Sequence, residues 1–408
     1  MIYGLRDFLT RHRRKFLITG VVVGGTFIAL KFVQRKLIDL QERRTREFLE
    51  KARRLQHFES TEHTCNQFII NMSAELGQAI IKECSTDDLL QQLRDNPSNK
   101  LDLWEEIKFV AFTRLTTFIY ASSMLVVALR IQLNVLGGYA YRATASDNEK
   151  IEINDVQKKQ YLMLLHHFLQ DGGLSDLIRL IRSKVVTIMR QMALSKRLSL
   201  TDIEQLFWSL QMAINSESNK DPCSKMCRYL LPSKLPDHGC SDNNSLLQQM
   251  FNETLDLLES DDVTTICSNN VCRGFSLAVD AIAESMGESI HLAQQSKVTS
   301  PRGDDDCIPS KTPNSTDLKT STSSTDNNNS TPASSISRND ECLININSVQ
   351  MALAKVIPIV NDLTSKGFDA NSRPQNLPTS LISFYVVAEK CKTLGANVYE
   401  TFSTSPAA

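Results

Sequence analysis

The chain has 408 residues, a net charge of −1, and 41% apolar against 22% charged residues. This balance is typical of a globular protein, and the near-zero net charge argues against recruitment of nucleic acid by a global field. Glycine and proline are scarce, at 15 and 12 residues, so long helices are favoured over many short strands. The predicted fold class is all-α.

The ten cysteines are scattered without a dense framework, which predicts reduced thiols in a cytosol-facing protein. Three Cys or His pairs invite a zinc assignment, but their spacings match no tight zinc site. These pairs are Cys223 with Cys227, His238 with Cys240, and Cys267 with Cys272. We therefore expect no metal and no cofactor.

Catalytic signatures are also missing from the sequence. It has no phosphate-binding G-x-x-x-x-G-K-[ST], no G-x-G-x-x-G, no G-x-S-x-G and no H-E-x-x-H. His166 and His167 sit in an apolar helical pattern and are expected to be packed or solvent-facing. The sequence predicts neither an enzyme nor a small-molecule substrate.

The N-terminus combines a basic cluster with an apolar run. Arg11 to Lys15 are followed by the uncharged stretch 16–30, and Lys31, Arg35 and Lys36 close it. The sequence lacks the cleavage site that a signal peptide would need, which argues against a signal peptide. A buried core helix is also disfavoured, because it would not be bracketed by so many cations. We expect a membrane anchor at 16–33 behind a short basic tail, 1–15. Cations on both sides leave its orientation open.

Beyond the anchor, the stretch 37–81 keeps a helical pattern. Leu37, Leu40, Phe48, Leu55 and other apolar residues form a stripe, and charges of both signs cover the rest. No glycine or proline interrupts residues 26–76. The anchor is therefore predicted to continue into a long helix that projects from the membrane.

The stretch 85–141 contains residues that are candidates for a partner-binding surface. Leu93, Lys100, Trp104 and Ile107 share one helical face if the break at Pro97 is a kink. Two interpretations stay open for Trp104. It either fills the core, as apolar stripes usually do, or anchors a partner's amphipathic helix with a flanking cation.

The apolar reach Phe109–Leu136 is expected to be a central core helix that stops at Gly137 and Gly138. A second membrane span is the alternative. Helices are predicted at 156–192 with a break at 171–173, and from a capping box at Thr201–Glu204. Further helices are expected at 246–258, 261–286, from 343 onward and at 377–402. The polar stretch 294–340 is expected to be a disordered insertion, so 34–408 forms one helical domain.

Several motifs occur in order along nearly the whole chain outside 294–340. They are A-R-R-L-Q-H-F-E-S, T-C-N, P-S-N-K-L-D-L-W-E-E-I-K, L-R-I-Q-L-N-V-L-G-G-Y, F-N-E-T-L-D-L-L-E-S, R-G-F-S, L-A-K-V-I-P-I-V-N and A-N-V-Y-E-T-F-S. With the basic-apolar N-terminus, the sequence resembles the peroxin three family. P-S-N-K-L-x-x-W is the most specific of these pieces.

The resemblance implies a single-pass protein of the peroxisomal membrane, with its short tail in the matrix and an elongated helical bundle in the cytosol. It implies docking of the import receptor peroxin nineteen, whose N-terminal amphipathic helix enters a groove at the membrane-distal end. Carried over by position, this groove includes Leu93, Pro97, Lys100, Trp104 and Ile107, and Lys355 flanks it. Lys100 would then pair with acidic residues of that helix. The alternative function is a structural tether between an organelle and the cytoskeleton or another membrane.

Overall fold

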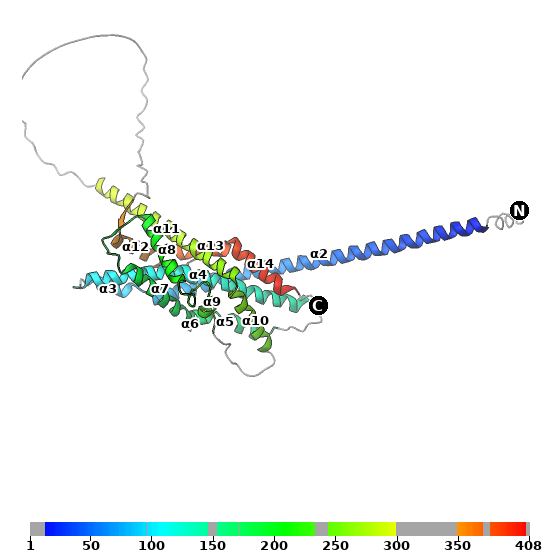
Figure 1. Ribbon diagram of the computed structural model, residues 1–408, viewed down its shortest axis with the longest axis horizontal. Coiled ribbons are helices and arrows are strands. Elements are labelled where there is room, and N and C mark those ends of the chain that lie inside the picture. Colours follow the sequence, from blue (N-terminus) through cyan, green and yellow to red (C-terminus); the bar gives the residue numbers. More distant parts are fainter. Residues whose placement is uncertain are drawn as a thin grey trace, which may run out of the picture.

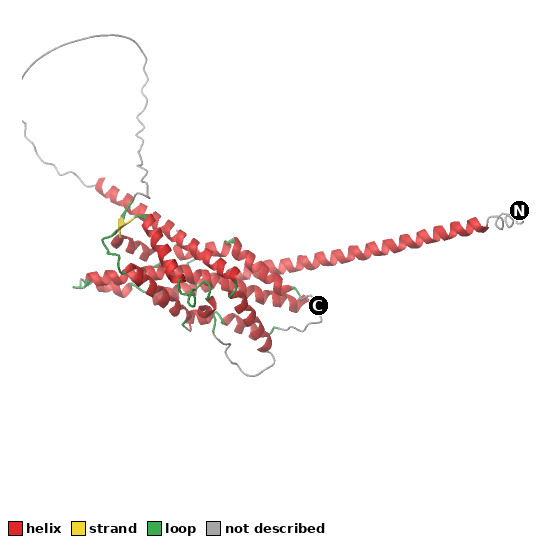
Figure 2. Ribbon diagram, in the orientation of Figure 1, coloured by secondary structure: helices red, strands yellow, loops and turns green. Residues whose placement is uncertain are grey.

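The computed structural model describes residues 13–95, 97–145, 153–170, 172–232, 244–298, 349–369 and 376–404. Only the course of the backbone is described for residues 13–23, 145, 244 and 290–298. The described part is almost entirely helical, as Figure 2 shows, which confirms the predicted fold class. The helices are α2 (Arg13–Glu83), α3 (Asp87–Arg94), α4 (Lys100–Ala145), α5 (Asp155–Met163), α6 (His166–Gln170), α7 (Gly173–Met189), α8 (Leu200–Asn215), α9 (Met226–Leu230), α10 (Asn244–Leu258), α11 (Asp261–Val298), α12 (Leu353–Leu363), α13 (Leu377–Val387) and α14 (Glu389–Ser403).

Helix α2 joins two different environments in one unbroken run of 71 residues. Its N-terminal half stands away from the other helices as a rod, and its C-terminal part enters the body (Figure 1). Where it enters, an apolar stripe with the helical period becomes buried against the core. This stripe is Cys65, Ile69, Met72, Leu76 and Ile80. The predicted long, unbroken helix is therefore confirmed.

Helix α4 is the centre of the body, and α2, α7, α11, α12, α13 and α14 all pack against it. Every residue from 110 to 135 is buried. It is long and apolar enough to cross a membrane, but 94% of its apolar window lies inside the protein. The structure thus confirms the central core helix, since neighbouring helices surround it on all sides.

The predicted end of α4 at Gly137 and Gly138 is wrong, because the helix continues to Ala145. The two glycines serve close packing. A Cβ on Gly137 would lie 2.6 Å from the Thr61 side chain, and one on Gly138 would lie 2.6 Å from Phe402 Cβ. Helices α2 and α14 therefore approach α4 closely at these positions, and the absence of a Cβ on the two glycines makes room for them.

Helix α8 begins with a capping box, two residues before the one predicted. Asp202 N donates to Ser199 Oγ at 3.2 Å, and Ser199 N donates to Asp202 Oδ2 at 2.8 Å. Ser199 is thus the N-cap, and Thr201 already lies inside the helix. The helix begins early because Ser199 has an extended backbone that matches an N-cap.

Three further differences concern element boundaries. The helix predicted at 377–402 is divided at Ala388 into α13 and α14. Helix α11 continues to Val298, so 294–298 are helical, and the rest of the predicted insertion lies outside the described residues. Two short strands, β1 (Arg197–Leu198) and β2 (Met351–Ala352), pair antiparallel, with Arg197 opposite Ala352.

Candidate partner-binding surface

Four of the six predicted site residues lie together where α3 meets α4, at the end of the body opposite the stalk (Figure 1). Leu93 and Trp104 are partly buried and pack against the core, Pro97 is partly buried, and Lys100 is exposed. We call these four residues the α3–α4 surface. The break in the helical pattern is a turn at 95–99, of which Asn96 lies outside the described residues.

Helix α3 packs against the body but is incompletely buried. Its apolar residues Leu89, Leu90 and Leu93 face the core, yet none of its eight residues is fully buried. Asp87 and Asp88 in the first turn and Arg94 in the last turn favour the helix through its dipole. The local sequence thus makes α3 a helix whose apolar side stays partly accessible.

Ile107 differs from its predicted neighbours because it belongs to the core. Its side chain is 1% exposed, whereas Trp104, less than one turn earlier, is partly exposed. Ile107 therefore does not itself present a surface to a partner. Leu101, three residues before Trp104 and next to it along the helix surface, is 68% exposed.

Lys108, a buried lysine near Trp104, connects α4 to the end of α7. Lys108 is 0% exposed, and its Nζ donates to the carbonyl oxygens of Met189 at 3.1 Å and Met192 at 3.0 Å. Its Nζ also lies 2.5 Å from Glu105 Oε2. The lysine thereby ties the end of α7 to α4 through two backbone carbonyls, of which that of Met189 also accepts from Met192 N at 3.0 Å.

Sequence reasoning missed Lys108. The one available signal was a cation between the apolar residues Ile107 and Phe109. A cation that is buried needs acceptors, but the sequence does not show whether they are carboxylates or backbone carbonyls. Which carbonyls these are depends on α7, about 80 residues further along the chain.

Lys355 stands on α12 and is exposed. The start of α12 is joined to the loop before β1, since Leu353 N donates to Lys196 O at 2.8 Å and Ala354 N to Leu194 O at 2.9 Å. Met192, at the start of this loop, accepts from Lys108. Among the hydrogen bonds and ion pairs of the described residues, none joins Lys355 directly to Lys100 or Trp104.

Arg114 of α4 forms hydrogen bonds to residues at the C-terminal ends of α2 and α12. Its guanidinium donates to Cys84 O at 3.3 Å, to Asn361 O at 2.7 Å and to Thr364 Oγ1 at 3.0 Å. These bonds tie the ends of α2 and α12 to α4. Burial raises the pKa of Cys84 to about 11, so its thiol stays protonated at neutral pH. The network is structural scaffolding and supplies no nucleophile.

The chemistry available here is that of a binding surface. It offers a partly exposed indole over a buried aliphatic floor, with an exposed ammonium group at Lys100 one turn away. Within the described ranges, no three His, Cys, Asp or Glu side chains come together as a metal site. Of the Cys and His pairs that were considered and set aside as zinc ligands, His238 and Cys240 lie outside those ranges.

The fold and this surface define a class: an elongated helical scaffold with a projecting N-terminal helix. The Peroxin-3 family model matches residues 7–100, 94–155 and 142–372. Peroxisomal biogenesis factor 3 of Mus musculus is 32% identical over 418 residues, covering 99% of this chain and 98% of its own, and the Homo sapiens protein is 32% identical over 419 residues with the same coverage. Peroxisome biogenesis protein 3-1 of Arabidopsis thaliana is 23% identical over 288 residues, covering 64% of this chain and 78% of its own.

The chain belongs to the Peroxin-3 family. This is a family of non-enzymatic peroxisome biogenesis proteins, which serves the import of peroxisomal membrane proteins. The resemblance read from the sequence motifs is thereby confirmed, as is the prediction that the protein is not an enzyme.

Proposed function

We propose that this protein docks the import receptor peroxin nineteen at the peroxisomal membrane. An amphipathic helix of the receptor binds the α3–α4 surface, with an apolar side chain against Trp104 and Leu93 and an acidic side chain against Lys100. The observation that carries the proposal is the partial exposure of Trp104 above the buried Ile107, at the end of the body away from the stalk. A partly exposed aromatic on a rigid floor is typical of binding hot spots.

The anchor part of the proposal places residues 16–33 in the bilayer and the bulk of the chain in the cytosol. Its support is the exposed apolar run in the described part of that segment, including Phe27 at 61% and Ile28 at 71%. Lys31 Nζ lies 5.6 Å from the centre of the Phe27 ring and Lys36 Nζ 5.7 Å from that of Phe32. Lysines that lie back over an apolar segment are typical of the membrane interface.

Calorimetric titration of the full chain in nanodiscs with the N-terminal helix peptide of peroxin nineteen tests the docking. We expect Trp104→Ala to weaken binding by about 2–4 kcal/mol, as for a central aromatic anchor. This corresponds to about a 30- to 900-fold rise in Kd. Trp208→Ala, which removes the second tryptophan of the chain, is the matched control and is expected to leave this Kd unchanged.

Unchanged affinity in a folded Trp104→Ala protein contradicts the docking surface. The same titration separates docking from the tether, which has a specific observation in its favour: residues 24–53 of α2 are exposed and form a long rod. A protein that acts only as a tether would not retain the receptor peptide in any variant.

A further inference from the structure

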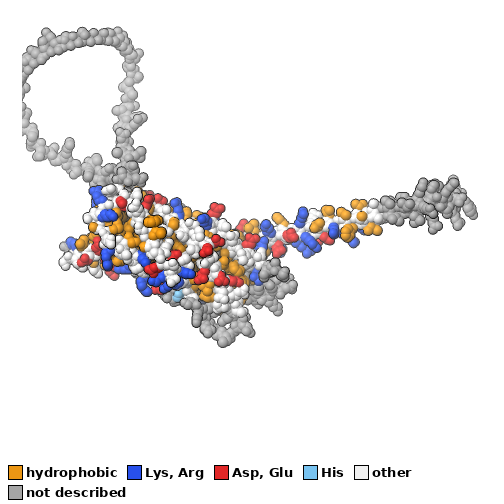
Figure 3. Space-filling view, viewed as in Figure 1, with side chains coloured by type: hydrophobic (Ala, Val, Ile, Leu, Met, Phe, Trp, Pro, Cys, Tyr) orange, Lys and Arg blue, Asp and Glu red, His pale blue; other side chains and the backbone are white. Residues whose placement is uncertain are grey.

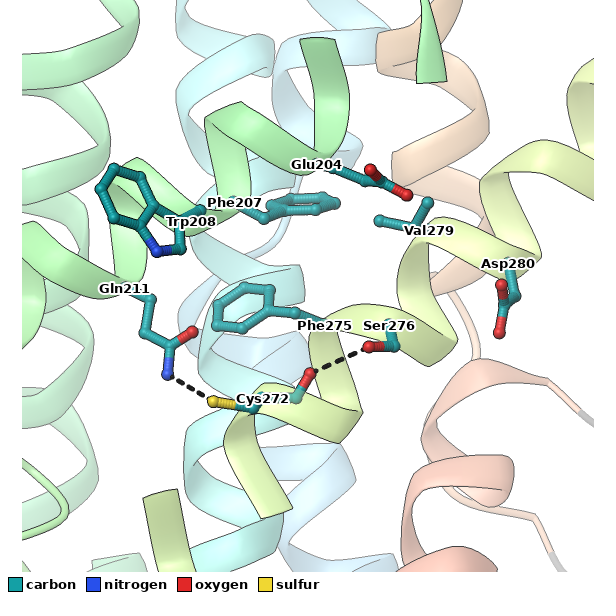
Figure 4. Close-up of a pocket in the computed structure, with 9 residues that line it drawn as sticks. All are labelled: Glu204, Phe207, Trp208, Gln211, Cys272, Phe275, Ser276, Val279 and Asp280. Atoms are coloured by element: carbon teal, nitrogen blue, oxygen red, sulfur yellow. Dashed lines mark hydrogen bonds between the residues drawn. The ribbon is translucent and has the colours of Figure 1, made fainter. Parts of the chain in front are cut away.

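A second apolar site lies between α8 and α11, on residues that the proposed docking does not use. It is a pocket of about 300 Å³, which we call the α8–α11 pocket (Figure 4). Its lining residues recur at helical spacing on the two helices. They are Glu204, Phe207, Trp208 and Gln211 from α8, and Cys272, Phe275, Ser276, Val279 and Asp280 from α11.

The floor of this pocket is rigid and apolar. The Phe207 and Phe275 rings face each other in Figure 4 with centroids 5.4 Å apart, and they are 1% and 6% exposed. Tyr120 of the central helix α4 lies edge-on behind Phe275, at 6.2 Å between centroids. Because α4 fixes the rings from behind, the floor is preformed and needs little rearrangement to receive a side chain.

Trp208 lies beside this floor and is exposed to water. Its side chain is 65% exposed, and Met212, one turn further along α8, is 52% exposed. An indole in this position contributes little to the core, although tryptophan carries a large apolar area. An exposed tryptophan and methionine beside an apolar pocket are typical of protein-binding surfaces.

Both charged side chains that line the pocket, Glu204 and Asp280, are acidic. Helices α8 and α11 carry Asp202, Glu204, Asp261, Asp262, Asp280, Glu284 and Glu288, against only Arg273 and Lys297. Glu204, Asp280 and Glu284 are exposed, and none of them belongs to an ion pair among the described residues. Arg273 is turned toward α13, 5.5 Å from the centre of the Phe384 ring.

We propose that the α8–α11 pocket binds a basic amphipathic helix of a partner protein. A large aliphatic or aromatic side chain of that helix enters the pocket onto Phe207 and Phe275, and Trp208 covers its flank. Lysine or arginine residues about one turn from this anchor meet Glu204 and Asp280, which lie at the same end of the pocket (Figure 4). The charge selects the partner, because an acidic helix would meet unpaired carboxylates at this end of the pocket.

This site therefore has the opposite charge preference from the α3–α4 surface. That surface presents Lys100 and suits a helix with acidic residues, whereas the α8–α11 pocket suits a basic one. The two sites share no residue. One protein molecule can thus hold two different helices at the same time.

The first test uses Trp208 as its own reporter. In Trp104→Phe, Trp208 is the only tryptophan, since the chain has two. The probe is an 18-residue helical peptide with leucines and one phenylalanine on one face and lysines on the other, added to the full chain in neutral-lipid nanodiscs. We expect saturable binding with a blue shift of the Trp208 emission, whereas a lysine peptide without apolar anchors gives no shift. Empty nanodiscs give the blank.

The second test exchanges the charges. Glu204→Lys with Asp280→Lys is expected to weaken the lysine peptide at least tenfold and to strengthen the same peptide with glutamates by at least tenfold. This gain shows that the variant is folded. Asp39→Lys with Glu50→Lys, on the exposed stalk, is the matched control and is expected to leave both affinities unchanged.

Three outcomes overturn the proposal. The first is the absence of saturable binding of the lysine peptide. The second is equal binding of the lysine and glutamate peptides in both proteins. The third is binding that Trp104→Ala abolishes and the charge exchange does not, because the peptide then sits on the α3–α4 surface. This last result leaves the docking of peroxin nineteen untouched, so the two proposals fail separately.

Discussion

Helices α2 and α4 both contain an apolar run long enough to suggest a membrane span, yet the structure places the two runs in opposite environments. The apolar run of α4 is buried among other helices, and its window is 94% buried. The described apolar residues of α2 near its start are exposed, among them Phe27 and Leu30 at 61% and 68%. In Figure 3 these apolar side chains cover the outer part of the rod, and charged ones cover the part nearer the body.

The two runs also differ in where their cations lie and in what these cations contact. Arg130 of α4 is 1% exposed, and its Nη2 donates to Asn66 Oδ1 at 2.7 Å and to Val386 O at 2.8 Å. Glu62 Oε1 lies 3.7 Å from its Nη1. In the described part of α2, the cations that follow its apolar run, Lys31, Arg35 and Lys36, are instead exposed. A buried cation with partners on neighbouring helices is typical of a core helix, whereas exposed cations beside an apolar run agree with the proposed anchor.

Removing the apolar run of α2 should give the largest effect. A chain that begins at Leu37 is expected to be monodisperse without detergent, because its remaining apolar helix α4 is already covered by protein. The full chain is expected to need detergent or lipid. Size-exclusion chromatography with light scattering measures both. Aggregation of the shortened chain, relieved by detergent, would place α4 in lipid and reverse the comparison.

Arg130→Ala should destabilise the body by about 2–5 kcal/mol, because it opens a cavity and leaves the partly buried Asn66 and Val386 oxygens without their donor. Urea unfolding of the chain that begins at Leu37 measures the loss. Arg46→Ala removes a 76% exposed arginine from the stalk and is expected to change the free energy of unfolding by less than about 0.5 kcal/mol. Equal effects of the two variants would refute a structural role for the buried cation.

Glycine substitutions sharpen the same comparison with a smaller effect. Gly138→Ala on α4 places a Cβ 2.6 Å from Phe402 Cβ and 2.8 Å from its backbone carbon, so a loss of about 1–3 kcal/mol is expected from overpacking. Gly25→Ala on α2 has nothing within 4 Å and should raise local helix stability by about 0.5–1 kcal/mol. Thermal unfolding followed by circular dichroism measures both changes. A neutral Gly138→Ala would contradict the close approach of α14.

The sequence predicted the features that arise from local pattern. The lack of helix breakers predicted α2, the uniformly apolar stretch predicted a central α4, and spacing placed Leu93, Lys100 and Trp104 near each other. Pairing between distant segments was not predictable. Gly137 and Gly138 read as a helix end because nothing near them shows that Thr61 and Phe402 need the space.

The same limit applies to the two candidate sites. Spacing placed Ile107 on the binding face, but the surrounding helices bury its side chain, so it belongs to the core and is not part of the surface. Trp208 read as one apolar residue of the helix after Thr201, and only the packing of α11 beside it creates a pocket. Sequence periodicity shows which side of a helix is apolar, and it does not show how deeply a neighbour covers that side.

The unbroken course of α2 also sets the distance between the α3–α4 surface and the membrane. With residues 16–33 in the bilayer, as proposed, the run from Gln34 to Glu83 rises at about 1.5 Å per residue and carries the α3–α4 surface about 75 Å above the lipid. If the import receptor docks on this surface, as proposed, the part of it that carries cargo must span this distance to reach the bilayer. The proposal therefore requires a segment of matching length between the docking helix of the receptor and its cargo-binding part.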